Sequence, residues 1–128
     1  AFFGGSSIYN GLDLTNGVWF NTYSNKGKGT GKTAVEISFP KSSQLDLYWQ
    51  DGPELNGWGE IISKYPDGTA AMVEGSSGKG WVILSGLHPE ATASWESGMS
   101  FTTSVSSQNA YAKTLINAAL NGTTLSHY

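Results

Sequence analysis

His88 and Glu90 are the side chains of this sequence whose types and spacing best suit catalysis, and Pro89 separates them. They follow Trp81 to Leu84, a run of bulky apolar residues between glycines that is typical of a buried strand. In extended backbone, residues i and i+2 point to the same side, so the imidazole and the carboxylate can share one site. The proline narrows the backbone freedom between them. The sequence therefore predicts a strand that ends in a fixed turn and delivers a polar pair suited to proton transfer.

A catalytic nucleophile is harder to find. The sequence has no cysteine, which excludes disulfides, thiolate metal sites and a cysteine nucleophile within these residues. The serines in glycine-rich surroundings lack the Gly-x-Ser-x-Gly pattern of a nucleophile elbow; they are Ser6, Ser7, Ser76 and Ser77. A single well-placed histidine with scattered carboxylates is not a metal ligand set, so we expect neither a metal nor a cofactor.

The segment from Asn25 to Thr33 ends in Gly-Lys-Thr, like a phosphate-binding loop. That loop needs a glycine five residues before Gly31, where this sequence has Lys26, and a helix after it. The residues that follow, Ala34 to Phe39, alternate as a strand does. We therefore interpret the segment as a flexible basic hairpin loop rather than a nucleotide site.

Composition narrows the class of protein. The 128 residues correspond to a single domain of residues 1–128 or to part of one. Glycine (17 residues) is about twice its ordinary share, and charged residues are only 13%. A net charge of −3 gives no basic footprint for nucleic acid, and no apolar run is long enough to span a membrane. The low charge and the lack of cysteine favour an exported or periplasmic protein over a cytoplasmic one.

The periodicity predicts a chain of short strands followed by one helix. The strands are expected at residues 18–20, 34–39, 44–49, 60–65, 70–74 and 81–84, with a hairpin turn at residues 66–69 and another turn at 51–53. The helix is capped by Ser106 or Ser107 and stopped by Asn121-Gly122, and its apolar face comprises Ala112, Leu115, Ile116, Ala119 and Leu120. His127 is interpreted as a mobile terminal residue.

With these elements in place, the sequence resembles a known family. Residues 48–54, 60–65, 66–68, 70–73 and 78–90 follow in order the pattern of the biotin-protein-ligase amino-terminal-like proteins. These are members of the class I glutamine-amidotransferase-like superfamily. The Gly-Lys-Gly, Leu-Ser-Gly and His-Pro-Glu elements of residues 78–90 are the specific part. The resemblance implies an α/β fold, a flavodoxin-like three-layer sandwich of helices around a mainly parallel sheet, here as its carboxy-terminal part with mixed strands and a final helix.

The resemblance also implies a Cys-His-Glu triad, in which His88 is the base and Glu90 orients it. A thiol is a useful nucleophile only as a thiolate, and an adjacent imidazole can take its proton. The family's cysteine precedes a helix that resembles residues 1–5, so this sequence resembles a domain that starts just past the nucleophile. We therefore expect an incomplete domain, completed by an amino-terminal segment that carries the cysteine or covered by self-association. No biotin-ligase activity is implied.

Two other functions stay open at this stage. The same fold can serve as a catalytically inactive binding or regulatory domain. Alternatively, the chain is an exported β-rich carbohydrate-binding module, which a row of tryptophans on one exposed face would support. The five tryptophans, at positions 19, 49, 58, 81 and 95, are first interpreted as core anchors. The substrate is not predicted.

Overall fold

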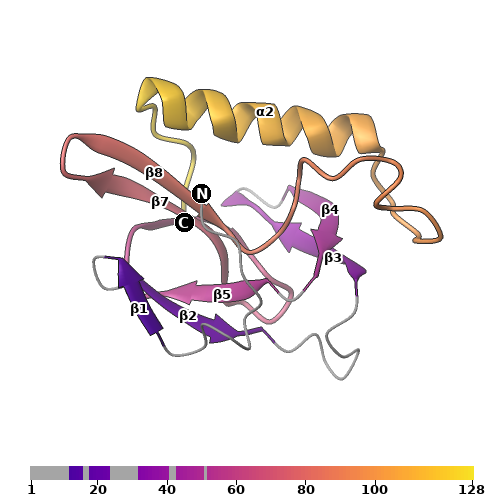
Figure 1. Cartoon of the computed structure of the whole chain (residues 1–128), viewed down its shortest axis with the longest axis horizontal. Helices are drawn as coiled ribbons and strands as arrows, with labels where there is room; N and C mark the ends of the chain where they lie inside the picture. Colours follow the sequence, from indigo (N-terminus) through magenta and orange to yellow (C-terminus); the bar gives the residue numbers. More distant parts are fainter. Residues whose placement is uncertain (1–11, 16–17, 24–31, 41–42, 51) are drawn as a thin grey trace.

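The computed structural model describes residues 12–15, 18–23, 32–40, 43–50 and 52–128, with the side chains of residues 12–22 and of Ser77 left out. The described part is a mixed α/β structure with one antiparallel sheet and a carboxy-terminal helix (Figure 1). The strands are β1 (Leu12–Thr15), β2 (Val18–Thr22), β3 (Thr33–Ser38), β4 (Gln44–Trp49), β5 (Pro53–Asn56), β6 (Glu60–Lys64), β7 (Ala70–Ser77) and β8 (Gly80–Ser85). The helix is α2 (Val105–Asn121).

Every strand pairing recorded among the described residues is antiparallel, in the order β1-β2-β5-β7-β6-β3-β4, with β8 also paired to β7. This differs from the mainly parallel sheet that the family resemblance implies. The reason is local, because short turns join β6 to β7 and β7 to β8, whereas parallel neighbours need a crossover of about a dozen residues or more. The predicted turn at residues 66–69 is confirmed, with hydrogen bonds from Tyr65 N–H to Thr69 O (2.8 Å) and from Thr69 N–H to Asp67 Oδ1 (3.0 Å).

Strand β7 is the centre of the sheet. On one edge it pairs with β6, and on the other it pairs first with β5, through Leu55 opposite Ala70, and then with β8. The chain that leaves β8 continues past Gly86 to His88, which forms an isolated bridge with Tyr48 on β4. Because β4 is the last strand of the sheet order, this bridge curls the sheet back on itself.

The core lies inside this curl and beneath α2, which contacts β8 and β4 (Figure 1). Its largest fully buried side chains include Trp49, Tyr65 and Met72, and Leu115 brings the helix into the same cluster. Tyr23 stacks on Tyr65 with ring centroids 3.8 Å apart. Burial raises the pKa of the Tyr65 hydroxyl well above its ordinary value, so the group stays protonated and donates to Pro53 O (2.7 Å).

Several sequence predictions need correction here. The residues of β8 are half-buried rather than buried. Strand β5 was not predicted, because Pro53 was interpreted as part of a turn, yet a proline can open a strand. The cap of α2 is Ser104, whose side chain accepts from Ser107 N–H, and not Ser106 or Ser107. The stop at Gly122 is confirmed, with a left-handed φ of 62°.

Candidate functional site

The His88–Glu90 turn lies where the chain leaves β8 and reaches β4. The His88 N–H donates to Tyr48 O (2.9 Å), and the Ala91 N–H donates to His88 O (3.2 Å), which closes a turn over Pro89 and Glu90. The two side chains therefore meet across a turn, not along the extended backbone that the sequence predicts. The predicted proximity itself is confirmed.

The distance between His88 Nδ1 and Glu90 Oε1 is 2.7 Å, with 25% of the histidine side chain and 47% of the glutamate side chain exposed. Burial by itself would raise the pKa of the Glu90 carboxyl, but the hydrogen bond from His88, the Glu90 backbone amide and the attraction to the imidazole outweigh it, so this pKa is lowered. The carboxylate can only accept, so Nδ1 carries the proton and Nε2 becomes the basic nitrogen of a neutral ring. This arrangement suits a general base.

Two aromatic rings surround the imidazole. Tyr48 and Trp95 each lie edge-on to His88, with centroid distances of 5.9 Å and 5.6 Å, and they are 5.6 Å from each other. The Tyr48 hydroxyl donates to Gln50 Oε1 (2.7 Å), and 44% of Trp95 is exposed. The imidazole is therefore held between a buried ring and an exposed one, at a position open to solvent.

Strand β4 positions this group through the alternation of its side chains. Asp46 and Tyr48 share one face of the strand, while Leu47 and Trp49 point to the other face and into the core. The Asp46 carboxylate accepts from the backbone amides of Thr102 (2.6 Å) and Thr103 (2.9 Å) and from the Thr103 hydroxyl. Asp46 thereby ties to β4 the segment that joins Trp95 to α2.

Two carboxyl groups near this turn, those of Asp46 and Glu96, are buried. Burial opposes ionisation of Asp46, but its bonds to Thr103 and Thr102 outweigh this and lower its pKa. At Glu96, burial raises the pKa against a hydrogen bond with Gln108, and repulsion from Asp46 adds to the rise. Asp46 already has several protein donors and both residues are buried, so we assign this pair to the structure of the loop rather than to catalysis.

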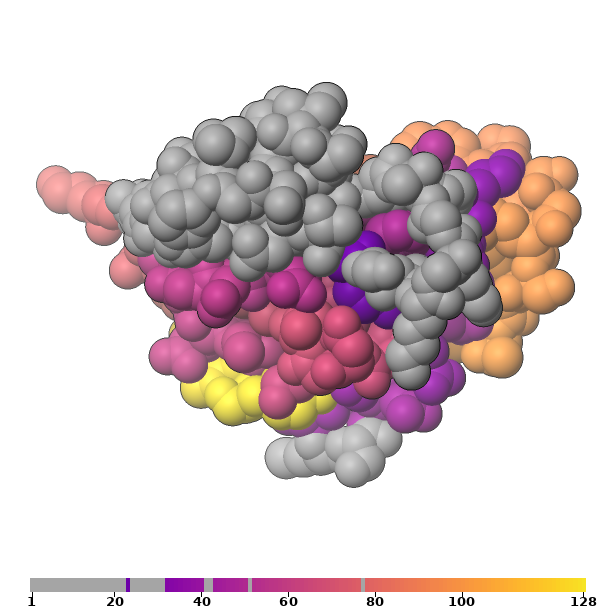
Figure 2. All heavy atoms as spheres, turned by 90° about the horizontal axis from the view of Figure 1, so that it is seen from below, coloured from indigo at the N-terminus to yellow at the C-terminus, as the bar shows by residue number. Residues whose placement is uncertain are grey.

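Among the serines considered as nucleophiles, Ser76 has a described side chain, and it does not lie at this site. Ser6, Ser7 and the side chain of Ser77 fall outside the described residues. Ser76 is exposed near the tip of the β7–β8 hairpin. That tip and the segment around residues 90–110 lie on opposite sides of the described structure in both views (Figures 1 and 2). Ser76 is therefore remote from the segment that carries Trp95.

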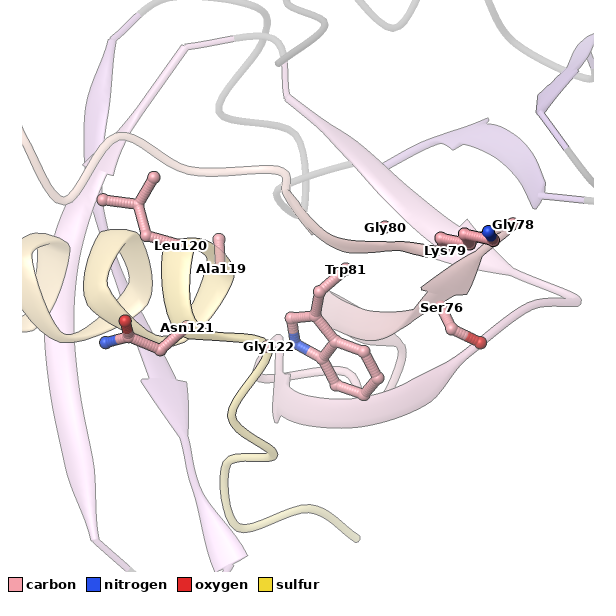
Figure 3. Close-up of a pocket in the computed structure, with 9 residues that line it drawn as sticks. All are labelled: Ser76, Gly78, Lys79, Gly80, Trp81, Ala119, Leu120, Asn121 and Gly122. Atoms are coloured by element: carbon pink, nitrogen blue, oxygen red, sulfur yellow. The ribbon is translucent and has the colours of Figure 1, made fainter.

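A cavity of about 500 Å³ lies between the hairpin tip and the carboxyl end of α2 (Figure 3). Trp81 and Asn121 line it, and Lys79 is its sole ionisable side chain among the lining residues. The rise of ~1.5 Å per helical residue places Asn121 roughly 18 Å along the axis from Asn109, which contacts the His88–Glu90 turn. The cavity has neither a carboxylate nor a histidine, so it is not part of the candidate site.

The described tryptophans do not form one sugar-binding row. Trp49 is buried, whereas Trp81 lines the cavity at the carboxyl end of α2 and Trp95 contacts His88. The Trp58 ring lies where a Cβ at Gly75 would project, on the face of β7 opposite to Ser76 and its register partner Trp81. The side chain of Trp19 lies outside the described residues.

The remaining sequence motifs add no second site among the residues that the structure describes. Residues 25–31 of the phosphate-loop-like segment lie outside the described residues, and Thr33 begins β3, so a strand follows as predicted. Within the described ranges, no group of three His, Cys, Asp or Glu side chains could hold a metal ion. No helix in this part of the chain is long and apolar enough to cross a membrane.

A scan against protein-family models and searches of curated proteins and of solved structures found no match to this chain. The function must therefore be argued from the site itself.

Sequence reasoning found His88 and Glu90 but missed the residues that surround them. Asp46 and Tyr48 were interpreted as positions of an alternating strand. Trp95 was interpreted as a core anchor, which is wrong, since 44% of it is exposed. The sequence of β4 could have indicated these neighbours. The face of β4 that carries Asp46 and Tyr48 continues to Gln50 just past the strand, and these residues are too polar for a strand buried on both faces. Asn109 gave no signal, since its contacts join residues about twenty positions apart.

Proposed function

We propose that this chain carries the base and the orienting carboxylate of a cysteine-dependent amidase or hydrolase, His88 and Glu90, and that the thiol is supplied by a segment outside these 128 residues. The observation that supports the proposal is the 2.7 Å contact between His88 Nδ1 and Glu90 Oε1 beside a partly exposed imidazole. The glutamine-amidotransferase-like fold is part of the proposal.

In this proposal, the parallel core of that fold would come from strands of an amino-terminal segment outside these 128 residues. The antiparallel strands described here would then form the carboxy-terminal edge of a larger sheet. The His-Pro-Glu turn after β8 and the final helix α2 are the features of this chain that support the assignment.

The proposed reaction follows from the tautomer of His88. With Nδ1–H donated to Glu90, Nε2 accepts the thiol proton, and the thiolate attacks the carbonyl carbon of an amide. The imidazolium then gives that proton to the departing nitrogen as the C–N bond breaks, which leaves a thioester. Water, deprotonated by the same Nε2, hydrolyses the thioester and returns the proton to the thiol. Glu90 stays ionised throughout and stabilises the imidazolium, which its lowered pKa supports.

The test uses the protein purified from its natural source, with every polypeptide identified by denaturing mass spectrometry. The alkylation rate of each cysteine by iodoacetamide is then measured in the wild type, His88→Ala and Glu90→Gln. We expect one cysteine to react at least about 100-fold more slowly in His88→Ala, with a smaller loss in Glu90→Gln.

His127→Ala is the matched control, because His127 also faces a carboxylate, Glu60, at 3.5 Å on the surface. It should leave the alkylation rate unchanged. A protein in which no cysteine depends on His88 would overturn the proposal and leave a binding or regulatory domain as the function to pursue.

A further inference from the structure

Asn109 connects helix α2 to the His88–Glu90 turn. Its side-chain amide donates to Pro89 O (2.8 Å) and to Ala91 O (3.1 Å), the carbonyl groups on either side of Glu90. Both bonds come from the single nitrogen Nδ2, whose two hydrogens match the two acceptors. The helix thus holds the backbone from which the Glu90 carboxylate projects.

The turn has few other ways to satisfy these carbonyl groups. Pro89 and Ala91 are buried, so their oxygens have limited access to water. The backbone donors of the turn are already used. His88 N–H bonds Tyr48 O, Ala91 N–H bonds His88 O, the Glu90 N–H bonds its own carboxylate, and Pro89 has no N–H. An external donor is required, and Asn109 supplies it.

Helix propensity does not explain an asparagine at this position. Asparagine is less favourable than alanine inside a helix, by roughly half a kcal/mol, because its side chain competes with the backbone. Here it lies in the second turn of a helix whose amino end is fixed by the Ser104 cap. A residue anchored in this way can transmit the helix position to the turn.

We propose that Asn109 is a positioning residue that sets the distance between the Glu90 carboxylate and the His88 imidazole. That this distance matters for catalysis rests on the proposed function. That Asn109 sets the distance does not depend on the proposed function. If Asn109 served stability alone, its loss would weaken the fold and leave the His88–Glu90 contact unchanged. The two roles are therefore separable by measuring that contact directly.

The experiment follows the Glu90 carboxyl by ¹³C NMR across pH in the 128-residue chain, together with urea unfolding. His88 acts on this carboxyl mainly through the hydrogen bond between Nδ1 and Oε1. In the wild type, the carboxyl should titrate below its ordinary value. In Asn109→Ala we expect the titration midpoint to rise by about half a unit or more towards the ordinary value, because the contact with His88 lengthens.

Two matched variants separate positioning from stability. Leu115→Ala should destabilise the helix contact with the core without touching the turn, and Asn117→Ala makes the same substitution at an exposed position of α2. Both should retain the wild-type midpoint of Glu90. Where Asn109→Ala does not fold, the similarly sized Asn109→Leu, which removes both donors without adding a charge, is measured instead.

A Glu90 midpoint that stays at the wild-type value in the Asn109 variant overturns the proposal, and so does an equal shift in Leu115→Ala. The measurement needs neither a cysteine nor a substrate. Its failure is therefore distinguishable from the failure of the proposed function, which is judged by alkylation of the complete protein.

Discussion

At the scale of single residues, three carboxyl groups near the site behave differently because their surroundings differ. Glu90 is half-exposed and bonded to an imidazole, Asp46 is buried and bonded to two amides and a hydroxyl, and Glu96 is buried beside Gln108. The first suits chemistry, since its partner changes charge. The second suits structure, since its partners, two backbone amides and a hydroxyl, stay neutral.

Replacing Asp46 by asparagine should lower the free energy of unfolding by about 1.5–3 kcal/mol at neutral pH, the usual value of hydrogen bonds to a charged group. The pKa of Asp46 is lowered in the folded state. Its contribution is therefore complete above the unfolded pKa of roughly 3.9 and is lost as the pH falls through the folded value. Urea unfolding of both proteins between pH 7 and pH 2 should show the difference shrinking in acid.

Thr103→Val identifies the partner, because it removes the hydroxyl that donates to Asp46. A double-mutant cycle between the two positions should give a coupling energy of about 0.5 kcal/mol or more. A difference between Asp46→Asn and the wild type that is the same at every pH would contradict the assignment.

At the scale of elements, the sequence predicted what is decided locally. The alternation in residues 44–49 predicted β4 with its observed bounds, and Gly122 predicted the end of α2. The helix face was only partly predicted. Ala112 and Leu115 are buried as expected, but Ile116 and Leu120 are 56% and 78% exposed. Gln108 is buried instead, because its amide bonds Thr103 O (3.1 Å), and hydrophobicity alone cannot anticipate that.

Two glycines allow the elements around the site to cross. The chain leaves β8 at Gly86, where it passes the chain that enters β5 at Gly52. A Cβ on Gly52 would collide with the Gly86 carbonyl, and a Cβ on Gly86 would collide with the Tyr65 hydroxyl and the Pro53 carbonyl. Since most of these are backbone atoms, side-chain rotation gives little relief. The crossing fixes where the chain begins its path to His88.

Gly52→Ala and Gly86→Ala should each destabilise the protein by about 3 kcal/mol, the upper part of the usual range for overpacking. Gly78→Ala is the control, because no atom lies within 4 Å of its added Cβ and it bears only the cost of its left-handed φ of 58°. We expect that cost to be about 1 kcal/mol. Chemical denaturation measures the free energy of unfolding of the three variants. Equal losses of stability in the Gly52, Gly86 and Gly78 variants would refute a steric crossing.

At the scale of the whole molecule, the site depends on contacts between distant parts of the chain. β4 supplies Tyr48, the turn after β8 supplies His88, and the following loop supplies Trp95. The bridge between Tyr48 and His88 joins residues forty positions apart. Such pairings are not encoded in any short window of sequence, so the sequence predicted the His-Pro-Glu pair but neither its aromatic neighbours nor the curl of the sheet.

The carboxy-terminal residues are also hydrogen-bonded to the sheet, although His127 was expected to be mobile. The fully buried Glu74 of β7 accepts from Leu125 N–H at both oxygens (3.0 and 3.2 Å), and Tyr128 N–H donates to Ile61 O (2.8 Å) on β6. The tail thus satisfies a carboxylate for which the sheet supplies no recorded donor among the described residues.

Deleting residues 124–128 should therefore lower the free energy of unfolding by about 3 kcal/mol, because it removes the partner of a buried charge while it keeps the helix cap at Gly122. Glu74→Gln in the shortened chain should recover part of this loss, since a neutral amide costs less to leave unpaired than a carboxylate. Urea unfolding of the full-length and shortened pairs measures both effects. A shortened chain as stable as the full-length one would mean that the tail does not satisfy Glu74, and that water reaches this carboxylate instead.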